Sequence, residues 1–158
     1  MNKSRCGFTL LELMVVVAIV ALFASIAIPA LMASRRKANE SSVFANLRNF
    51  ATSMSTYSQD QDNQCFPKSR AYFGDYFSHL DPRGGYKFYY TCNVSCYIYY
   101  ACPHSLNKGR KAYFVDESGC VYAAKVDKKE DLGEPTISFD YHEIKRITKP
   151  KLTWKKES

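Results

Sequence analysis

The feature that most constrains this chain is a continuous apolar segment from Phe8 to Met32, in which Glu12 is the one charged residue. A hydrocarbon core is about 30 Å thick and an α-helix rises about 1.5 Å per residue, so about 20 apolar residues can cross a membrane. Beyond Ser34 the sequence becomes polar, aromatic and basic. We therefore expect a membrane-length helix followed by a single folded domain, because 158 residues leave little room for a second full core.

The residues before the apolar segment decide which kind of membrane helix this is. They include Lys3 and Arg5 and no acid. A secretory signal peptide has an apolar stretch of about 7–15 residues with a small-residue cleavage site after it. Here the apolar run is too long, and Cys6 precedes it, whereas the cysteine of a lipoprotein signal follows it. Two interpretations remain: a plain N-terminal anchor, or a precursor that is cut on the near side of its apolar helix.

The sequence Gly7-Phe8-Thr9-Leu10-Leu11-Glu12, which runs directly into the apolar helix, resembles the class III signal of the type IV pilin and pseudopilin family. The resemblance implies that prepilin peptidase cuts after Gly7 and that the new first residue, Phe8, becomes N-methylated. It makes Glu12 the fifth residue of the mature chain, a position that the family uses in assembly. Pro29 lies where many pilins carry a proline inside the helix. The match covers residues 3 to 40.

Physical arguments support a role for Glu12 independently. A carboxylate within a membrane helix costs about 2.5–3.5 kcal/mol on insertion scales, so it normally has a partner or a function. Cleavage after Gly7 would create a cationic amine on Phe8, about one helical turn away. An amine of the same or a neighbouring subunit would neutralise the carboxylate and set the axial register of the subunits. The alternative is an acid that is tolerated near the membrane interface.

Pro29 and the flanking charges bear on the state of the helix and on its orientation. A proline removes one helical hydrogen bond, so we expect a bend or a loosened turn near Ser25. This turn either melts when helices pack into a filament or is a harmless bend.

Basic residues stand at both ends of the apolar segment, so counting them favours the two possible membrane orientations almost equally. The resemblance implies a single-pass precursor in the inner membrane, with Ala33 onward outside the cytoplasm, and a mature form in an extracellular or periplasm-spanning filament.

The helix is expected to continue beyond the membrane to about Gln59. Its apolar residues follow a helical spacing and form one stripe: Val43, Phe44, Leu47, Phe50, Ala51, Met54 and Tyr57. We expect this stripe to pack on the chain's own sheet. A free coiled coil is the alternative, but the aromatic side chains are bulky for a coiled-coil seam.

Short β-rich runs predict the rest of the domain. Residues 86–92, 96–102, 111–116 and 120–126 are separated by tight turns and predict an antiparallel meander, to which 136–141 adds a candidate fifth strand. Aromatic rings occur on both faces of these strands, so we expect one face to meet the helix and the other a neighbouring subunit or solvent. The predicted fold class is α+β: a long N-terminal helix packed on a small antiparallel sheet.

The expected organisation has five parts. These are a leader (1–7), a transmembrane or filament-core helix (8–33), an amphipathic continuation of that helix (34–60), a β-sheet head (61–144) and a basic C-terminal tail (145–158).

Cysteine usage suggests disulfides outside the cytoplasm. Six cysteines are present and Cys6 would leave with the leader, so five remain: Cys65, Cys92, Cys96, Cys102 and Cys120. Cys92 and Cys96 flank a three-residue turn and are expected to face each other across a hairpin. The other three would supply a second bridge and leave one thiol over. A zinc site is disfavoured because the spacing lacks the usual short pairs, so no metal and no cofactor is predicted.

No motif of an enzyme is present. The three histidines are isolated, and the sequence has no GxSxG, HExxH, P-loop or GxGxxG pattern.

The basic tail, with Lys149, Lys151, Lys155 and Lys156 near Trp154, suggests a weaker hypothesis: contact with DNA through phosphates and stacking. The alternative is a solvated tail whose charge meets acidic neighbours.

The sequence therefore predicts a structural protein, a subunit of a type IV pilus or pilus-like filament. Its expected partners are identical or related pilin subunits, prepilin peptidase, an inner-membrane assembly platform and the lipid bilayer. A type II secretion pseudopilin is the nearest alternative, although the acid cluster that binds calcium in many major pseudopilins has no convincing counterpart here. A membrane-anchored binding module that never polymerises, with the basic tail as its binding surface and DNA as a candidate ligand, is the alternative from a different class.

Overall fold

The structure is a computed structural model, and it describes residues 8–60, 66–68, 84–93, 95–138, 146–150 and 152–157. The chain divides into two compact units, Met1–Arg35 and Arg36–Ser158. The expected leader, the Gly7 cleavage site and Cys65 lie outside the described residues.

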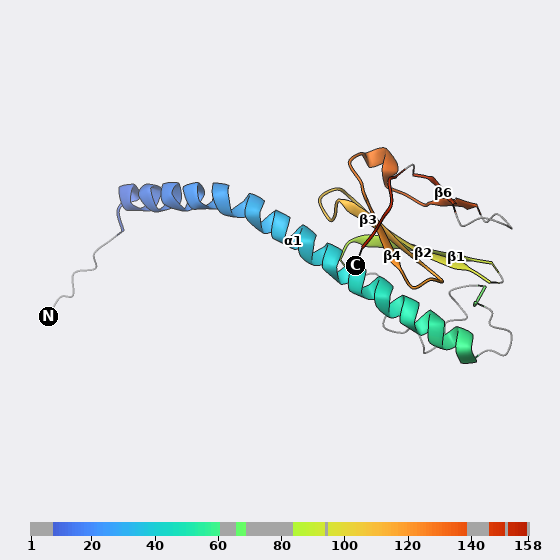
Figure 1. Ribbon diagram of the computed structural model, residues 1–158. Helices are drawn as coiled ribbons and strands as arrows, with labels where there is room; N and C mark the ends of the chain where they lie inside the picture. Colours follow the sequence, from blue (N-terminus) through green and yellow to red (C-terminus); the bar gives the residue numbers. More distant parts are fainter. Residues whose placement is uncertain are drawn as a thin grey trace. The chain divides into compact units, whose positions relative to one another are not determined.

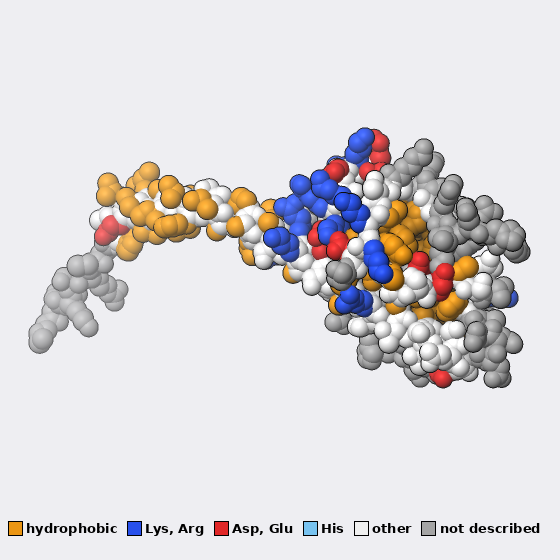
Figure 2. All heavy atoms as spheres, viewed as in Figure 1, with side chains coloured by type: hydrophobic (Ala, Val, Ile, Leu, Met, Phe, Trp, Pro, Cys, Tyr) orange, Lys and Arg blue, Asp and Glu red, His pale blue; other side chains and the backbone are white. Residues whose placement is uncertain are grey.

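Helix α1 (Leu10–Asp60) begins two residues after Phe8 and is the element that the apolar segment predicted (Figure 1). In the first unit its large apolar side chains are exposed on all sides, from 77% at Leu10 to 43% at Met32. Hydrophobic side chains cover this part of the helix in Figure 2. An apolar surface of this extent marks a membrane or protein contact, and the helix is long and apolar enough to cross a bilayer.

In the second unit, the predicted stripe of α1 packs on the sheet. Val43, Leu47, Phe50, Ala51 and Met54 are buried, and they belong to one core cluster with sheet residues such as Tyr99 and Val115. The ring of Phe50 stacks on the ring of Tyr99 with 3.9 Å between their centroids. The expectation that the stripe packs on the chain's own sheet is confirmed.

The main sheet is antiparallel and has five strands in the order β1-β2-β3-β4-β7. The first four are β1 (Tyr86–Cys92), β2 (Tyr97–Pro103), β3 (Lys111–Asp116) and β4 (Val121–Lys125), and they form the predicted meander. The fifth is β7 (Lys155–Lys156), which pairs with Tyr122 and Ala123 of β4. The predicted α+β class is thus confirmed.

Two polar residues of α1 hold the loop between β2 and β3. The side-chain amide of Asn39 donates to the carbonyl of Lys108 at 2.9 Å. The Glu40 carboxylate accepts from the backbone N–H of Arg110 at 2.8 Å. Gly109 lies between these contacts, close to the Tyr86 ring. The loop is therefore fixed on the helix at the start of β3.

The second face of the sheet differs from expectation, because the chain itself covers it. Strands β5 (Thr136–Ser138) and β6 (Arg146–Lys149) form a separate two-stranded sheet. A second cluster joins buried Ile98, Tyr100, Cys102, Ala112 and Val126 to half-buried residues that include Ile137, Ile147, Leu152 and Trp154. The expectation that this face meets a neighbouring subunit or solvent was wrong, because the C-terminal segment supplies the apolar side chains that cover it.

The expectations for the candidate fifth strand and for the tail also need correction. The candidate fifth strand, 136–141, forms only Thr136–Ser138 in its described part, and it belongs to the small sheet. The fifth strand of the main sheet comes instead from the basic tail, for which no strand was predicted. Short β-strands with many lysines have no apolar alternation of their own, so their pairing depends on the partner strand.

Candidate functional site

The start of α1 is a reciprocal arrangement between Thr9 and Glu12. The Glu12 Oε2 atom accepts from the backbone N–H of Thr9 at 3.0 Å and from its hydroxyl at 2.8 Å. In return, Thr9 Oγ1 accepts from the backbone N–H of Glu12 at 3.2 Å. This is a capping box, in which the residue before the helix and the third helical residue satisfy each other's free N–H groups.

The capping box places the one acid of the apolar segment next to the predicted processing site. Phe8 is the residue before Thr9, and its side chain is 75% exposed. The carboxylate also lies at the helix N-terminus, where the positive end of the helix dipole favours a negative charge. Glu12 is therefore oriented toward the chain end that cleavage after Gly7 would create.

Glu12 was predicted as a functional residue from the sequence, whereas Thr9 was not. The signal was present, because Thr9-Leu10-Leu11-Glu12 has the T-x-x-E spacing of a capping box immediately before an apolar run. The family resemblance rests on the spacing between glycine, phenylalanine and glutamate, and it implies no role for the threonine.

The helix is unbroken at Pro29. A proline has no N–H, so the carbonyl of Ser25 loses the bond that it would otherwise accept from residue 29. The Ser25 hydroxyl donates to the carbonyl of Leu22 at 2.7 Å, which adds a side-chain bond one turn earlier. The loosening of this turn on assembly stays a prediction.

The four described cysteines, Cys92, Cys96, Cys102 and Cys120, carry free thiols. The expectation that Cys92 faces Cys96 was wrong, because the register pairs Cys92 with Tyr97. Cys96 then lies beside Asn93, whose N–H donates to the Cys96 carbonyl at 2.7 Å. A shift of one residue moves a side chain to the opposite face of a sheet, so these two thiols do not oppose each other. Bridges that involve Cys65 lie outside the described residues.

The remaining cysteines are in contrasting surroundings. Cys102 is buried in the second core cluster, and burial raises the pKa of its thiol. Cys120 is half-buried and lies immediately before β4. Hydrogen bonding from the Ser118 side chain, and then from Lys156, lowers the pKa of the Cys120 thiol. In the described part of the chain, no group of His, Cys, Asp and Glu side chains could hold a metal ion.

The residues of the DNA hypothesis lie in different parts of the C-terminal segment. Trp154 is half-buried in the second core cluster and packs edge-on against Phe114 and Tyr100, with centroid distances of 4.8 and 6.0 Å. Lys155 and Lys156 form β7. Lys149 belongs to β6 through its backbone, and Lys151 lies outside the described residues.

Comparison with known proteins gives two matches. The family model described as the prokaryotic N-terminal methylation motif matches residues 2–28. The type IV wide pilus major component PilA4 of Thermus thermophilus is 40% identical over 61 residues, which are 39% of this chain and 47% of that protein. The chain thus spans about half the length of the curated relative that it matches. No solved structure matches.

Proposed function

We propose that this chain, a type IV pilin-like protein in its methylation motif and its fold, is a structural subunit of a type IV pilus or pilus-like filament. The observation that carries the proposal is the capping box of Thr9 and Glu12 at the start of an otherwise apolar, exposed helix. A helix of this kind needs lipid before assembly and other helices after it.

Processing would change the charge at this helix end. Hydrolysis of the Gly7–Phe8 bond by prepilin peptidase leaves a carboxylate on Gly7 and an amine on Phe8. The Phe8 amine, methylated or not, is a cation within about one helical turn of the Glu12 carboxylate. Cleavage thus gives an acid that costs free energy within the membrane a cationic partner, with which it forms an ion pair.

Assembly would use the same pair and the apolar surface together. Each processed helix would leave the bilayer through an inner-membrane assembly platform and bury its apolar side chains against those of related subunits. An apolar interface does not itself specify axial position, since neighbouring registers bury similar areas. The Glu12 carboxylate and an amine on a neighbouring Phe8 would specify it, because a mismatched register leaves both charges unpaired in an apolar surrounding.

Mass spectrometry of the N-terminal peptide tests this proposal. Filaments sheared from cells are compared with the membrane fraction, and a Gly7→Ala variant serves as the uncleaved control. N-methylated Phe8 as the first residue of the sheared fraction, with none from the control, would support a surface filament.

The other outcomes distinguish the alternatives. A processed peptide confined to membranes would favour a secretion pseudopilus. An intact Met1 peptide, in cells that process their other prepilins, would contradict the proposal and leave a membrane-anchored protein that does not polymerise.

A further inference from the structure

The loop between β2 and β3 brings two basic residues to the part of α1 that opens the unit Arg36–Ser158. Lys108 accepts a hydrogen bond at its carbonyl from Asn39, and Arg110 donates its backbone N–H to Glu40, at 2.9 and 2.8 Å. These partners are 69 and 70 residues apart in the chain. The side chains of Lys108 and Arg110 are exposed. The fold therefore places two solvent-facing cations beside the helix.

Helix α1 adds cations of its own at this place. Arg36 lies one helical turn before Glu40, and residues four apart lie on the same face of a helix. Lys37 follows it and is exposed. We refer to Arg36, Lys37, Lys108 and Arg110 together as the basic collar. Two of its members come from α1 and two from the loop that α1 holds.

The charge of the basic collar is largely uncompensated. Lys37, Lys108 and Arg110 form no ion pair within the part of the chain that the structure describes. Glu40, which accepts from the Arg110 backbone, offsets one of the four positive charges. In Figure 2 the Lys and Arg side chains of the visible face are concentrated on one part of the head, with acidic side chains among them.

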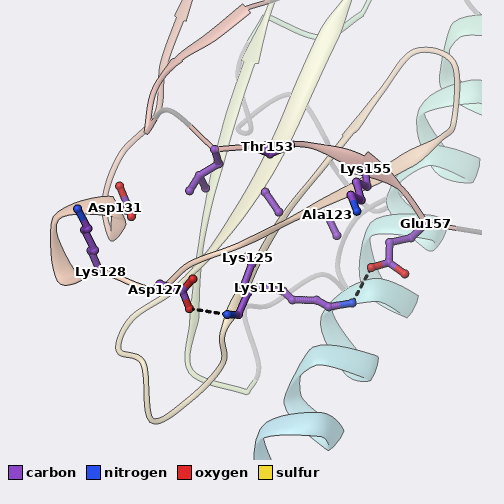
Figure 3. Close-up of a pocket in the computed structure, with 11 residues that line it drawn as sticks. Lys111, Ala123, Lys125, Asp127, Lys128, Asp131, Thr153, Lys155 and Glu157 are labelled. Carbon is purple, nitrogen blue, oxygen red and sulfur yellow. Dashed lines mark hydrogen bonds and ion pairs between the residues drawn. The ribbon is translucent and has the colours of Figure 1, made fainter.

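Lysines further along the sheet are already paired with acids. Lys111 Nζ lies 2.6 Å from Glu157 Oε1, and Lys125 Nζ lies 3.0 Å from Asp127 Oδ1. Both pairs line the pocket of about 730 Å³ that Figure 3 shows. Four lysines and three acids line this pocket, so its lining is close to neutral. The collar is therefore a more strongly charged surface than the pocket.

The basic collar begins close to the end of the membrane-length segment. Arg36 is four residues after Met32 in the same helix, about 6 Å further along the axis, and Asn39 is about 10 Å further. The headgroup layer extends about 5–8 Å beyond the hydrocarbon core on each side. Long basic side chains can direct their charged ends several ångströms away from the backbone, toward the interface. The collar thus lies at the level of lipid phosphates when the apolar segment spans a bilayer.

We propose that the basic collar docks the head on anionic phospholipid, with lipid phosphates as the ligands of its side chains. This inference rests on the proposed function, because it requires a precursor that α1 anchors in a membrane. Arginine binds phosphate through a planar fork of N–H groups and lysine binds it as a point charge. Each basic residue near an anionic surface strengthens the attraction about fivefold.

Anchoring is the reason to expect lipid rather than a soluble polyanion. The apolar segment keeps the collar next to the headgroups at a high effective concentration, so docking needs little intrinsic affinity. DNA or an acidic protein would have to bind from solution and compete with these phosphates. Salt screens exposed charges, so docking should be lost at high ionic strength.

Chemical footprinting of lysines tests the proposal on the full chain. The chain is reconstituted in nanodiscs of phosphatidylcholine, or of equal parts phosphatidylcholine and phosphatidylglycerol, and the acetylation rate of each lysine is followed by peptide mass spectrometry. We expect Lys108 to react at least fivefold more slowly in the anionic discs, and this difference to disappear at high salt.

Lys68 is the internal control. It is exposed and follows Pro67, whose carbonyl accepts hydrogen bonds from Tyr90 and Cys92. These residues lie toward the end of β1 that is remote from the β2–β3 loop. The acetylation rate of Lys68 should therefore be the same in both kinds of disc.

Two variants assign the protection to the collar. The double substitution Lys37→Gln and Arg110→Gln should weaken docking on the order of thirtyfold and return Lys108 to its rate in neutral discs. The fold should tolerate it, since both side chains are exposed and the Arg110 contact with Glu40 uses the backbone. Lys68→Gln is the matched control and should leave Lys108 protected.

The proposal is overturned if Lys108 reacts equally fast in both kinds of disc, or if the double variant keeps its protection. It is also overturned if duplex DNA protects Lys108 in neutral discs while phosphatidylglycerol does not, since the collar would then bind nucleic acid.

Failure of docking is distinguishable from failure of the proposed function, because footprinting needs an anchored chain but neither processing nor polymerisation. Methylated Phe8 in sheared filaments, with Lys108 unprotected, would overturn the docking alone. Protection of Lys108 without any methylated Phe8 would support the docking and contradict the filament.

Discussion

Glu12 and Thr9 hold each other through reciprocal hydrogen bonds, of 3.0 Å to the Thr9 N–H and 3.2 Å to the Thr9 hydroxyl oxygen. The residue proposed to set filament register thus also begins the helix. A capping interaction contributes about 1 kcal/mol to a helix. The charge and the cap are separate properties, and substitutions can remove them one at a time.

Three variants separate these roles in assembly. Glu12→Ala removes charge and cap, Glu12→Gln keeps an oxygen that can accept from Thr9 but removes the charge, and Thr9→Val removes the reciprocal hydroxyl but keeps the charge. We expect both Glu12 variants to lose sheared filaments, measured by immunoblot, while Thr9→Val retains most of them. Loss of filaments in Thr9→Val together with full assembly of Glu12→Gln would show that the cap is the essential property.

Gly109→Ala should destabilise the head. A Cβ added at Gly109 would lie 2.0 Å from the Tyr86 hydroxyl oxygen, which donates to the Lys111 carbonyl at 2.9 Å. Relieving the clash would move a buried ring, so we expect a loss of about 1–3 kcal/mol in the free energy of unfolding. Thermal or denaturant unfolding of the full chain in detergent measures it.

The matched control for this substitution is Gly133→Ala. No atom lies within 4 Å of a Cβ at that position. Exposed substitutions of this kind change stability by no more than about 0.5 kcal/mol. Equal stability of the two variants would contradict the close packing of the loop on Tyr86.

The single tryptophan should report that the C-terminal segment is packed. Trp154 contacts Tyr100 and Phe114, and its Nε1 is buried without a hydrogen-bond acceptor among the described residues. We expect blue-shifted fluorescence that iodide and DNA quench only weakly, with a red shift on unfolding in guanidinium. Strong quenching of the folded chain by iodide would show that this segment is solvated and would contradict the packing of Trp154 on Tyr100 and Phe114.

Cys120 should be alkylated at a lower pH than an ordinary cysteine. Hydrogen bonds from Ser118 and Lys156 stabilise its thiolate and lower the thiol pKa, and the thiolate is the reactive form. Pulsed iodoacetamide labelling followed by peptide mass spectrometry gives the midpoint of reactivity against pH. Lys156→Gln should move that midpoint to higher pH.

Two comparisons control the cysteine measurement. Lys155→Gln removes the neighbouring lysine, which lies on the other face of the sheet, and should leave the midpoint in place. Cys102 should stay unlabelled in the folded chain, because it is 1% exposed and burial raises its pKa. A Cys120 midpoint that does not respond to Lys156→Gln would contradict the proposed contact.

The local elements could be predicted from the sequence because their signals are periodic and continuous. The stripe that contains Leu47 and Phe50 has helical spacing, and the runs at 86–92 and 111–116 coincide with strands β1 and β3. The methylation motif was also recognisable, since its residues are adjacent in the chain. These features depend on neighbouring residues alone.

Pairings between distant segments could not be predicted in the same way. The hairpin register separated Cys92 from Cys96 by one position, and the tail became β7 because β4 had an open edge for it. Neither choice leaves a local pattern, since a register depends on what both strands bury.

The sequence by itself determined the apolar helix, the position of Glu12 at its start, the stripe that follows the apolar segment and the four-stranded meander. The tertiary structure decided which segment covers the second face of the sheet, where the thiols point and which lysines share a pocket. The physical reason is that the apolar periodicity that favours a helix or a strand is contained in the sequence of that segment. The covering of a sheet face, by contrast, depends on a balance of burial and pairing between residues that lie far apart in the chain.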